Sequence, residues 1–217
     1  MRVPALLEIN NLHFAYTAAQ PLLQGLTLQI GRGDRLGITG DNGCGKTTLL
    51  LLCAGVLTAQ QGTIYCCGQP VKVGHFQPQL GVVLQNPADQ LIGATVAEDV
   101  AFGPENLGQP PTAVQARVQE ALALTHTTHL ADRVPHQLSG GEQRMVAIAG
   151  ILAMRPQLIL YDEPTAFLDR RNCQDLIAFL QQDPTPRMIV SHDAAFLQAV
   201  CNQVLELVAG QLRPLAL

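Results

Sequence analysis

Hydrophobic and polar residues alternate near the start of the chain. Apolar side chains recur at nearly every second position over Leu7–Tyr16 and again over Leu26–Ile30. A period of two is typical of a half-buried β-strand, so the two runs predict a pair of antiparallel strands. A Gly-rich turn over 31–34 then leads into a short apolar strand that contains Leu36 and Ile38.

Further along, capping residues mark the starts of helices. Thr95 and Glu98 form a capping-box pattern that predicts a helix to about Asn106, and Thr112 is expected to cap another helix to about Leu124. Short apolar runs between Gly and Pro residues predict strands. The other expected elements are a helix over 49–57, strands over 62–66 and 80–84, a helix over 143–154, a strand over 158–161, a helix over 173–180, a strand over 188–190 and, after a short helix, a strand over 204–208.

A glycine-rich segment follows the strand that contains Ile38. Residues 40–47 read GDNGCGKT and match the P-loop pattern G-x-x-x-x-G-K-[ST]. Glycines let backbone amides approach an anion, and the following helix begins with its positive dipole end at the same point. Lys46 is expected to contact the β and γ phosphates, and the Thr47 hydroxyl to ligate Mg²⁺. The nucleotide-binding residues predicted from this segment are Asn42, Gly43, Cys44, Gly45, Lys46, Thr47 and Thr48.

An acidic pair ends the apolar strand at 158–161. A carboxylate at the tip of a buried strand is costly unless a cation or hydrogen bonds satisfy it. Asp162 is therefore expected to hold Mg²⁺ through water, and Glu163 to polarise the attacking water. The alternative is a strand that simply ends in a polar turn, which the P-loop makes the less favoured interpretation.

Residues 138–142, LSGGE, predict a second anion site just before a helix. The hydroxyl of Ser139, the amides of Gly140 and Gly141 and the start of the helix are all suited to bind phosphate. The chain then has two phosphate sites but only one P-loop lysine. This favours a head-to-tail pair in which Ser139 of each chain closes over the nucleotide of the other chain.

These motifs, in this order, resemble the ABC ATPase family, whose signature matches LSGGE, and the resemblance extends over Leu7–Gly210. It implies one α/β domain over 1–217. Its P-loop NTPase (RecA-like) core, with an antiparallel β subdomain, would comprise 1–86 and 155–217. An inserted α-helical subdomain, which carries the signature, would comprise 87–154.

The resemblance implies roles for further residues. Tyr16 would stack on adenine, although a tyrosine that packs at a strand end is the alternative. Gln85 would reach Mg²⁺ and sense the γ-phosphate. Asp169 would lie in the loop that crosses the dimer seam, and Glu142 would complete the signature. His192 would hold the γ-phosphate and the water, with a purely structural histidine as the alternative.

Residues 84–107 are similar to the cobalt-type, or energy-coupling factor (ECF), branch of importer ATPases. In that branch an integral membrane protein docks its coupling helices beside this loop. The resemblance implies a membrane subunit that docks near Gln85–Gln90, with Asp89 and Gln90 in the groove unless they form only a solvated helix start. The implied function is to bind ATP and Mg²⁺ and power import of a transition metal ion or vitamin, as a homodimer or with a related ATPase.

Three positions depart from the family pattern. Cys44 stands where the P-loop usually has Ala or Ser, Met145 replaces a usual arginine of the signature helix, and Phe167 replaces a usual glycine of the seam loop. The last two bear on contacts between subunits more than on ATP binding. Because the chain ends at Leu217, we expect no dimerisation through the C-terminal extension of many relatives.

Composition and charge limit the remaining possibilities. The longest apolar runs are too short to span a bilayer, and the N-terminus is too short and polar for a signal peptide, so we expect no direct membrane insertion. The implied location is the cytoplasmic face of a prokaryotic membrane. A soluble ABC-type ATPase that acts on nucleic acid or ribosomes is an alternative, but the net charge of −4 offers no basic field and argues for no nucleic-acid partner. A nucleotide-binding regulator without hydrolysis is another, against which Glu163 and His192 argue.

Overall fold

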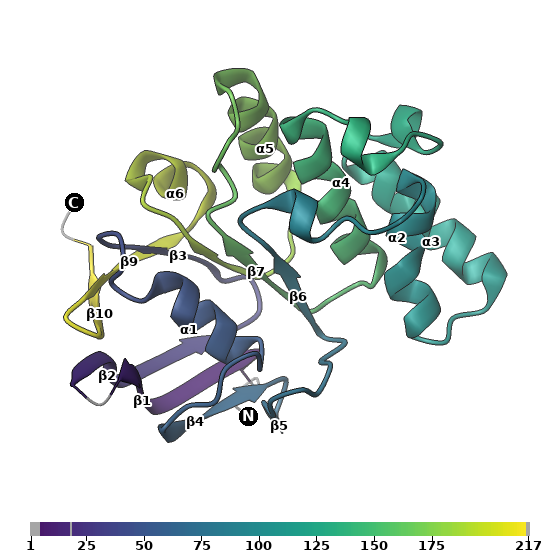
Figure 1. Ribbon diagram of the computed structural model, residues 1–217. Helices are drawn as coiled ribbons and strands as arrows, with labels where there is room; N and C mark the ends of the chain where they lie inside the picture. Colours follow the sequence, from purple (N-terminus) through teal and green to yellow (C-terminus); the bar gives the residue numbers. More distant parts are fainter. Residues whose placement is uncertain (1–4, 18, 216–217) are drawn as a thin grey trace. The chain divides into compact units, whose positions relative to one another are not determined.

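The computed structural model describes residues 5–17 and 19–215, which form two compact units (Figure 1). The core unit contains the residues up to Leu80, Gln157–Glu163 and the residues from Pro184 onward. The helical unit contains Gly81–Pro156 and Pro164–Asp183. Part of the N-terminal stretch considered for a signal peptide, residues 1–4, lies outside the described residues, as do the last two residues of the chain.

The helical unit differs in extent from the subdomain expected over 87–154. It also includes the segment 164–183, which holds α5 (Arg170–Gln182). This helix packs against α4 (Gly140–Ala153) of the same unit. The sequence does not reveal this association, because α5 follows a core strand directly.

One sheet of the core unit is antiparallel and has the strand order β2-β1-β4-β5. Its strands are β1 (Leu7–Thr17), β2 (Gln20–Ile30), β4 (Gln61–Cys66) and β5 (Gln69–Pro70). The alternation predicted for the first two strands is confirmed, because the apolar side chains of one face are buried: Leu7, Ile9, Leu12, Phe14, Leu26, Leu28 and Ile30.

In the second sheet, five strands of the core unit follow the order β10-β9-β3-β8-β7. They are β3 (Arg35–Thr39), β7 (Leu158–Asp162), β8 (Arg187–Val190), β9 (Gln203–Val208) and β10 (Gln211–Pro214). Strands β3, β8 and β7 run parallel, so their carboxyl ends lie at the same edge. The chain passes to the helical unit within β6 (Leu80–Val83).

The helix after the P-loop differs from the expected helix over 49–57. Helix α1 spans Lys46–Cys53 and begins directly after Gly45, which has a left-handed φ of 112°. It ends before Leu57 because Gly55, at φ 71°, turns the chain away from the helical path. The first residue of the helix is therefore Lys46. The short helix expected before the strand over 204–208 is α6 (Ala194–Val200).

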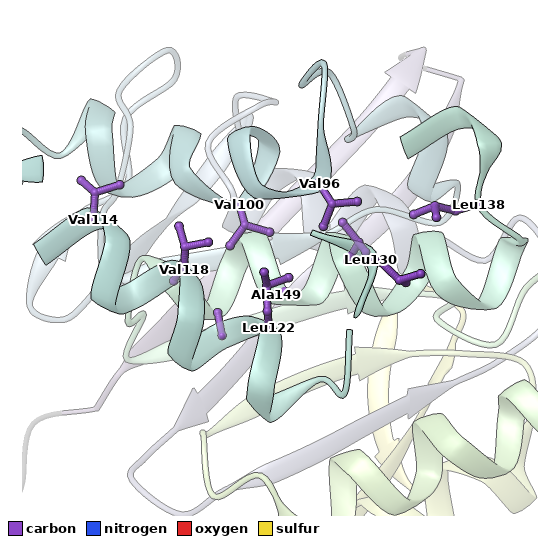
Figure 2. Packing of buried hydrophobic residues seen from close by; sticks show 11 residues of the cluster. Val96, Val100, Val114, Val118, Leu122, Leu130, Leu138 and Ala149 are labelled. Atoms are coloured by element: carbon purple, nitrogen blue, oxygen red, sulfur yellow. The ribbon is translucent and has the colours of Figure 1, made fainter. Parts of the chain in front are cut away.

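The helical unit packs α2 (Val96–Asn106), α3 (Pro111–Leu124) and α4 around an apolar core (Figure 2). A short 3₁₀ turn at Pro87–Asp89 precedes α2, and two more at Thr128–Leu130 and Pro135–Gln137 lie between α3 and α4. Branched aliphatic side chains and alanines fill the space between the helices. The buried residues of this core are Val96, Val100, Val114, Val118, Ala121, Leu122, Leu130, Leu138, Val146, Ala149 and Ala153.

The sequence predicts helix caps at Thr95 and Thr112, and the structure shows where both helices begin. Thr95 accepts a hydrogen bond from the Glu98 amide at 3.2 Å, as predicted. The prediction for Thr112 is wrong, because α3 begins at Pro111, whose fixed φ suits the first helical position, and Thr112 lies inside the first turn. Within the described ranges, no helix has the length and apolar character needed to cross a bilayer.

Candidate functional site

Glycines set the backbone path of the P-loop in the core unit. At Gly40, φ is 147°, and a Cβ atom would lie 2.7 Å from the backbone oxygen of Leu207. At Gly43, φ is 78° and no other atom lies within 4 Å of the position that a Cβ would take. The loop backbone is therefore open on its outer side, where an anion could approach the amides.

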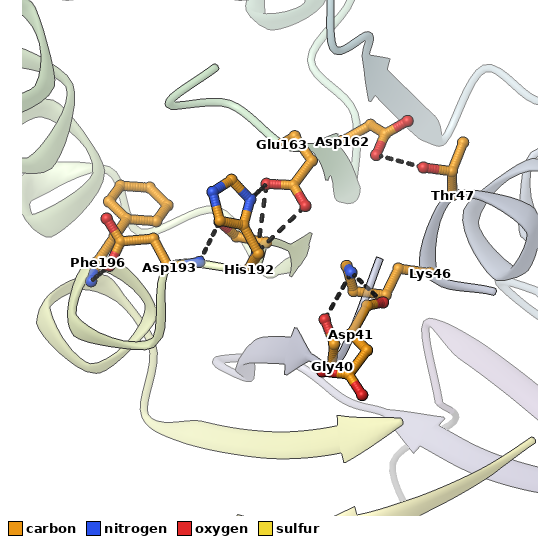
Figure 3. A network of polar contacts seen from close by, with 10 residues as sticks. Gly40, Asp41, Lys46, Thr47, Asp162, Glu163, His192, Asp193 and Phe196 are labelled. Atoms are coloured by element: carbon orange, nitrogen blue, oxygen red, sulfur yellow. Dashed lines mark hydrogen bonds and ion pairs between the residues drawn. The ribbon is translucent and has the colours of Figure 1, made fainter. Parts of the chain in front are cut away.

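Lys46 lies across the mouth of this loop. Its side chain is only 6% exposed, and its Nζ donates hydrogen bonds to the carbonyl oxygens of Gly40 at 2.8 Å and Asp41 at 3.1 Å (Figure 3). These contacts hold the ammonium group over the loop backbone. A phosphate at the loop would meet both the amide groups and this charge.

Thr47 and Asp162 provide oxygen atoms beside the P-loop. The Thr47 Oγ1 donates to Asp162 Oδ1 at 3.0 Å, which joins the first turn of α1 to the end of β7. Asp162 is only 5% exposed, so its carboxylate is held at one place. Hydroxyl and carboxylate oxygens are ligands that Mg²⁺ prefers, and the pair therefore fits a magnesium site with water in its other positions.

Glu163 and His192 form a second polar pair at the same sheet edge. Glu163 Oε2 lies 2.9 Å from His192 Nδ1, and Oε1 accepts a hydrogen bond from the His192 amide at 3.1 Å. Glu163 is 8% exposed, whereas the histidine side chain is 65% exposed. Glu163 also has a positive φ of 41°, a strained value of the kind that concentrates at functional sites. The carboxylate is thus oriented, and the imidazole can still reach a ligand.

Tyr16 lies beside the start of α1. Its hydroxyl is 3.2 Å from Thr48 Oγ1, and its ring contacts Phe14 edge-on with centroids 5.0 Å apart. The ring is nevertheless 64% exposed. A flat base could stack on the free face, so the geometry permits both contact with a nucleotide and the packing role at a strand end.

The predicted second anion site, in the helical unit, is the start of α4. Ser139 accepts from the Glu142 amide, and the Glu142 carboxylate accepts from the Ser139 amide at 2.8 Å and its hydroxyl at 2.7 Å. This capping box explains why α4 begins at Gly140 rather than at Gln143. The hydrogen bonds from Ser139 lower the pKa of Glu142. Ser139 and Gly140 are exposed, so both can meet a partner molecule.

Two neighbours shape the same corner of the helical unit. The Asn172 carboxamide lies where a Cβ at Gly141 would be, so a larger residue at 141 would displace the Asn172 side chain. Asp169 caps α5 by accepting from the Asn172 amide at 2.8 Å. Nearby, Phe167 has a φ of 63° and is 81% exposed. An aromatic ring therefore projects to solvent where the family usually has glycine.

Gln85 belongs to the helical unit and its side chain is exposed. Its action on the γ-phosphate stays a prediction. Gln90, expected in a docking groove, turns its side chain inward instead, with Oε1 accepting from the Leu84 amide at 3.1 Å and Nε2 donating to the Val82 carbonyl at 3.3 Å. Asp89 accepts from the Asn86 side chain at 3.0 Å.

The sequence does not single out two charged residues that are buried near the segment Gln85–Gln90. Arg144 is 0% exposed and donates to the carbonyl oxygens of Leu84 and Gln85. Asp99 accepts from the amides of Ile92 and Gly93, both at 2.7 Å. Asp99 directly follows Glu98, and Arg144 follows Glu142 and Gln143, so no change of polarity along the helix marks either residue as buried.

The chain is similar to known proteins over most of its length. A family model described as ABC transporter matches residues 23–166. A putative ABC transporter ATP-binding protein of Synechocystis sp. is 49% identical over 210 residues, which are 97% of this chain and 74% of the relative. The energy-coupling factor transporter ATP-binding protein EcfA of Methanothermobacter thermautotrophicus is 39% identical, over 95% of this chain and 69% of the relative.

Two solved structures have the same fold. One is cbiO1 from Clostridium perfringens, part of the ABC transporter complex cbiONQ, with a TM-score of 0.87 at 32% identity over 96% of this chain and 87% of the other. The second is an ATP-binding cassette solved as a dimer in a post-hydrolysis state with ADP and Pi. It has a TM-score of 0.81 at 24% identity and covers 97% of this chain and 99% of its own.

Proposed function

This chain belongs to the ABC transporter family of ATP-binding proteins, and we propose that it powers import of a small nutrient, a transition metal ion or a vitamin, through an integral membrane partner. As a member of this family the chain is an ATPase. The relatives named EcfA and cbiO1 support the choice of an ECF or cobalt-type importer. Transport direction, nutrient class and partner are the proposed part.

The observation that carries the proposal is the arrangement at the carboxyl ends of β3, β7 and β8. These neighbouring parallel strands bring the P-loop, the acidic pair and His192 to one edge of the core unit (Figure 3). A polyphosphate bound there would meet a positive charge at Lys46, a cation site at Thr47 and Asp162, and a carboxylate at Glu163. This is the set of groups that phosphoryl transfer to water requires.

Each residue at this edge has a separate proposed role in ATP hydrolysis. Lys46 and the loop amides hold the β and γ phosphates, and Thr47 and Asp162 hold Mg²⁺, which when bound offsets negative charge on the phosphate oxygens. Glu163 accepts a proton from water as the water oxygen attacks the γ phosphorus and the bond to the β-phosphate oxygen breaks. His192 orients the Glu163 carboxylate and is placed to hold the γ-phosphate.

We place Ser139 at the nucleotide of a second chain. The exposed Ser139–Gly141 corner would complete the phosphate cage of the partner, and each partner would do the same in return. To donate to a phosphate, the Ser139 hydroxyl must turn away from Glu142, while the amide bonds of the capping box stay in place. Hydrolysis and phosphate release would remove this contact and favour opening of the pair. The dimeric cassette with ADP and Pi supports pairing of this kind.

The membrane partner is proposed to dock near Gln85–Gln90. There the exposed residues are Gln85, Asn86, Ala88 and Asp89, because Gln90 is engaged with the backbone. Docking of this kind would hold the chain at the cytoplasmic face of a prokaryotic membrane, which is the proposed location. The second chain of the pair is either identical or a related ATPase.

Uptake measurements in cells that lack the gene test the proposal. Accumulation of labelled Co²⁺, Ni²⁺ or a vitamin such as biotin should fall and return with the wild-type gene, but not with Glu163→Gln. The control is Glu105→Gln, an exposed glutamate on α2. Unchanged uptake of all these compounds, together with slowed translation or DNA repair, would instead favour an ATPase acting on ribosomes or nucleic acid.

A further inference from the structure

Arg144 is the largest fully buried polar side chain of the helical unit's signature helix. It lies on α4, shortly after the exposed Ser139 corner, and its exposed fraction is 0%. Its Nη1 donates to the carbonyl oxygen of Leu84 and its Nη2 to that of Gln85. The guanidinium group therefore joins α4 to the backbone of the loop that carries Gln85.

The chemistry of this contact makes it stiff. The planar guanidinium directs its donors as a fixed fork, so two adjacent carbonyl groups bound by it cannot turn independently. A charged group taken out of water is tolerated only where its hydrogen bonds are made, so displacement of either carbonyl is costly. The Gln90 side chain adds a second restraint, since it accepts from the Leu84 amide. Leu84 is thus held at both its amide and its carbonyl.

Arg144 and Ser139 lie on one rigid helix. The separation between them is about one and a half helical turns, so a shift of the first turn of α4 is transmitted to the arginine with little loss. The loop carbonyls must follow the guanidinium. One of these carbonyls belongs to Gln85 itself. The exposed Gln85 side chain must therefore move as well.

We propose that Arg144 is a positioning residue that couples the two nucleotide sites of the pair. The inference rests on the proposed function, in which Ser139 serves the nucleotide of the partner, and on the predicted action of Gln85 on the γ-phosphate of the chain's own nucleotide. Closure of Ser139 over the partner's nucleotide would then set the position of Gln85 through Arg144. ATP binding at one site would favour the hydrolytic arrangement at the other.

A double-mutant cycle between Arg144→Met and Gln85→Ala tests the coupling in the full-length chain. Arg144→Met should lower kcat about tenfold and bring the Hill coefficient for ATP towards 1, while nucleotide affinity changes less than about twofold. Because Arg144 acts through Gln85, the same substitution in the Gln85→Ala background should change kcat by less than about twofold.

A control variant separates coupling from helix stability. Arg117→Met removes another arginine contact to α4, a single hydrogen bond of 3.4 Å from Arg117 Nη1 to the Ala153 carbonyl near the other end of the helix, and should leave kcat and the Hill coefficient unchanged. Thermal unfolding of each variant reports loss of stability separately.

An equal fold-loss from Arg144→Met in both backgrounds, or full activity with unchanged cooperativity, would overturn the coupling role. If the methionine variant does not fold, Arg144→Lys takes its place in the cycle and should show a smaller loss, because one ammonium group cannot hold both carbonyls equally well. Absence of ATP hydrolysis by the wild-type chain would overturn the proposed function and this inference with it, and is distinguishable because no variant is involved.

Discussion

At the scale of single residues, the chemistry depends on how two charged groups are held before substrate arrives. Glu163 is nearly buried and receives hydrogen bonds from both the amide and the ring of His192. Lys46 is held by two carbonyl groups of its own loop. Little rearrangement is then needed when a nucleotide binds, which favours catalysis by a preorganised site.

Glu163→Gln should retain ATP binding and lose turnover. The glutamine carboxamide has the size of the glutamate side chain but cannot accept a proton from water. Loss of a general base typically costs about 10²–10⁴-fold in rate. Phosphate release measures the rate, and size-exclusion chromatography with MgATP should show the variant trapped as a closed pair. Turnover at the wild-type rate would remove Glu163 from its role, and Glu105→Gln is the control on an exposed glutamate.

Lys46→Ala should lose nucleotide binding itself. The phosphates lose their counter-charge, and the carbonyl groups of Gly40 and Asp41 lose their donor. Titration with a fluorescent ATP analogue should show affinity weaker by about tenfold or more, as expected when a charged hydrogen bond is removed. Lys72→Ala, at an exposed lysine, should bind like the wild type. Equal affinities for both variants would contradict the assignment of Lys46.

At the scale of elements, the start of α4 combines a helix cap with a binding corner. The capping box satisfies amides that would otherwise lack partners in the first turn. Its carboxylate lies at the positive end of the helix dipole, where a negative charge is favourable. The corner is therefore ordered without a nucleotide, and its shape depends on the protonation state of Glu142.

The capping box predicts a pH dependence of stability. Hydrogen bonds from Ser139 lower the pKa of Glu142 below its ordinary value of 4.5. The stabilisation is therefore complete above the unfolded pKa and is lost as the pH falls through the folded pKa. At neutral pH the wild type should have a higher melting temperature than Glu142→Gln. Under acid conditions the two melting temperatures should converge. A difference that stays constant with pH would contradict this.

The sequence predicts the strands and helices that have a clear hydrophobic pattern or motif. It does not predict the helix ends and caps that are decided by local backbone geometry. Alternation reveals β1 and β2, and the P-loop pattern reveals the strand and helix around it. The ends of α1 are missed because left-handed Gly45 and Gly55 set them. The cap at Thr112 is missed because Pro111 already supplies the helix start.

The same contrast holds for the candidate site. Lys46, Asp162 and Glu163 can be predicted because their residue types sit at fixed positions relative to strands, and their roles stay predictions. Arg144 is missed because a single arginine on a helix usually lies at the surface, whereas here two distant backbone carbonyls bury it. Contacts of this kind depend on the tertiary fold, which residue spacing does not encode.

At the scale of the whole molecule, the proposed ATPase is complete only as a pair. The core unit contains the P-loop and Glu163, the proposed general base, and the helical unit exposes Ser139 and Gly140, which are proposed to meet another chain. In such a pair, a chain without a working P-loop still offers a working Ser139 corner. A chain with a damaged corner still offers a working P-loop.

Mixing two inactive variants tests this composite site most directly. Lys46→Ala and Ser139→Arg should each be inactive alone, because every site in either pair lacks one half. In an equimolar mixture of homodimer-forming chains, random pairing should restore about a quarter of the wild-type sites, and phosphate release should rise accordingly. Activity that stays at the level of the separate variants, although mixed pairs form, would contradict closure of each nucleotide site by the partner chain.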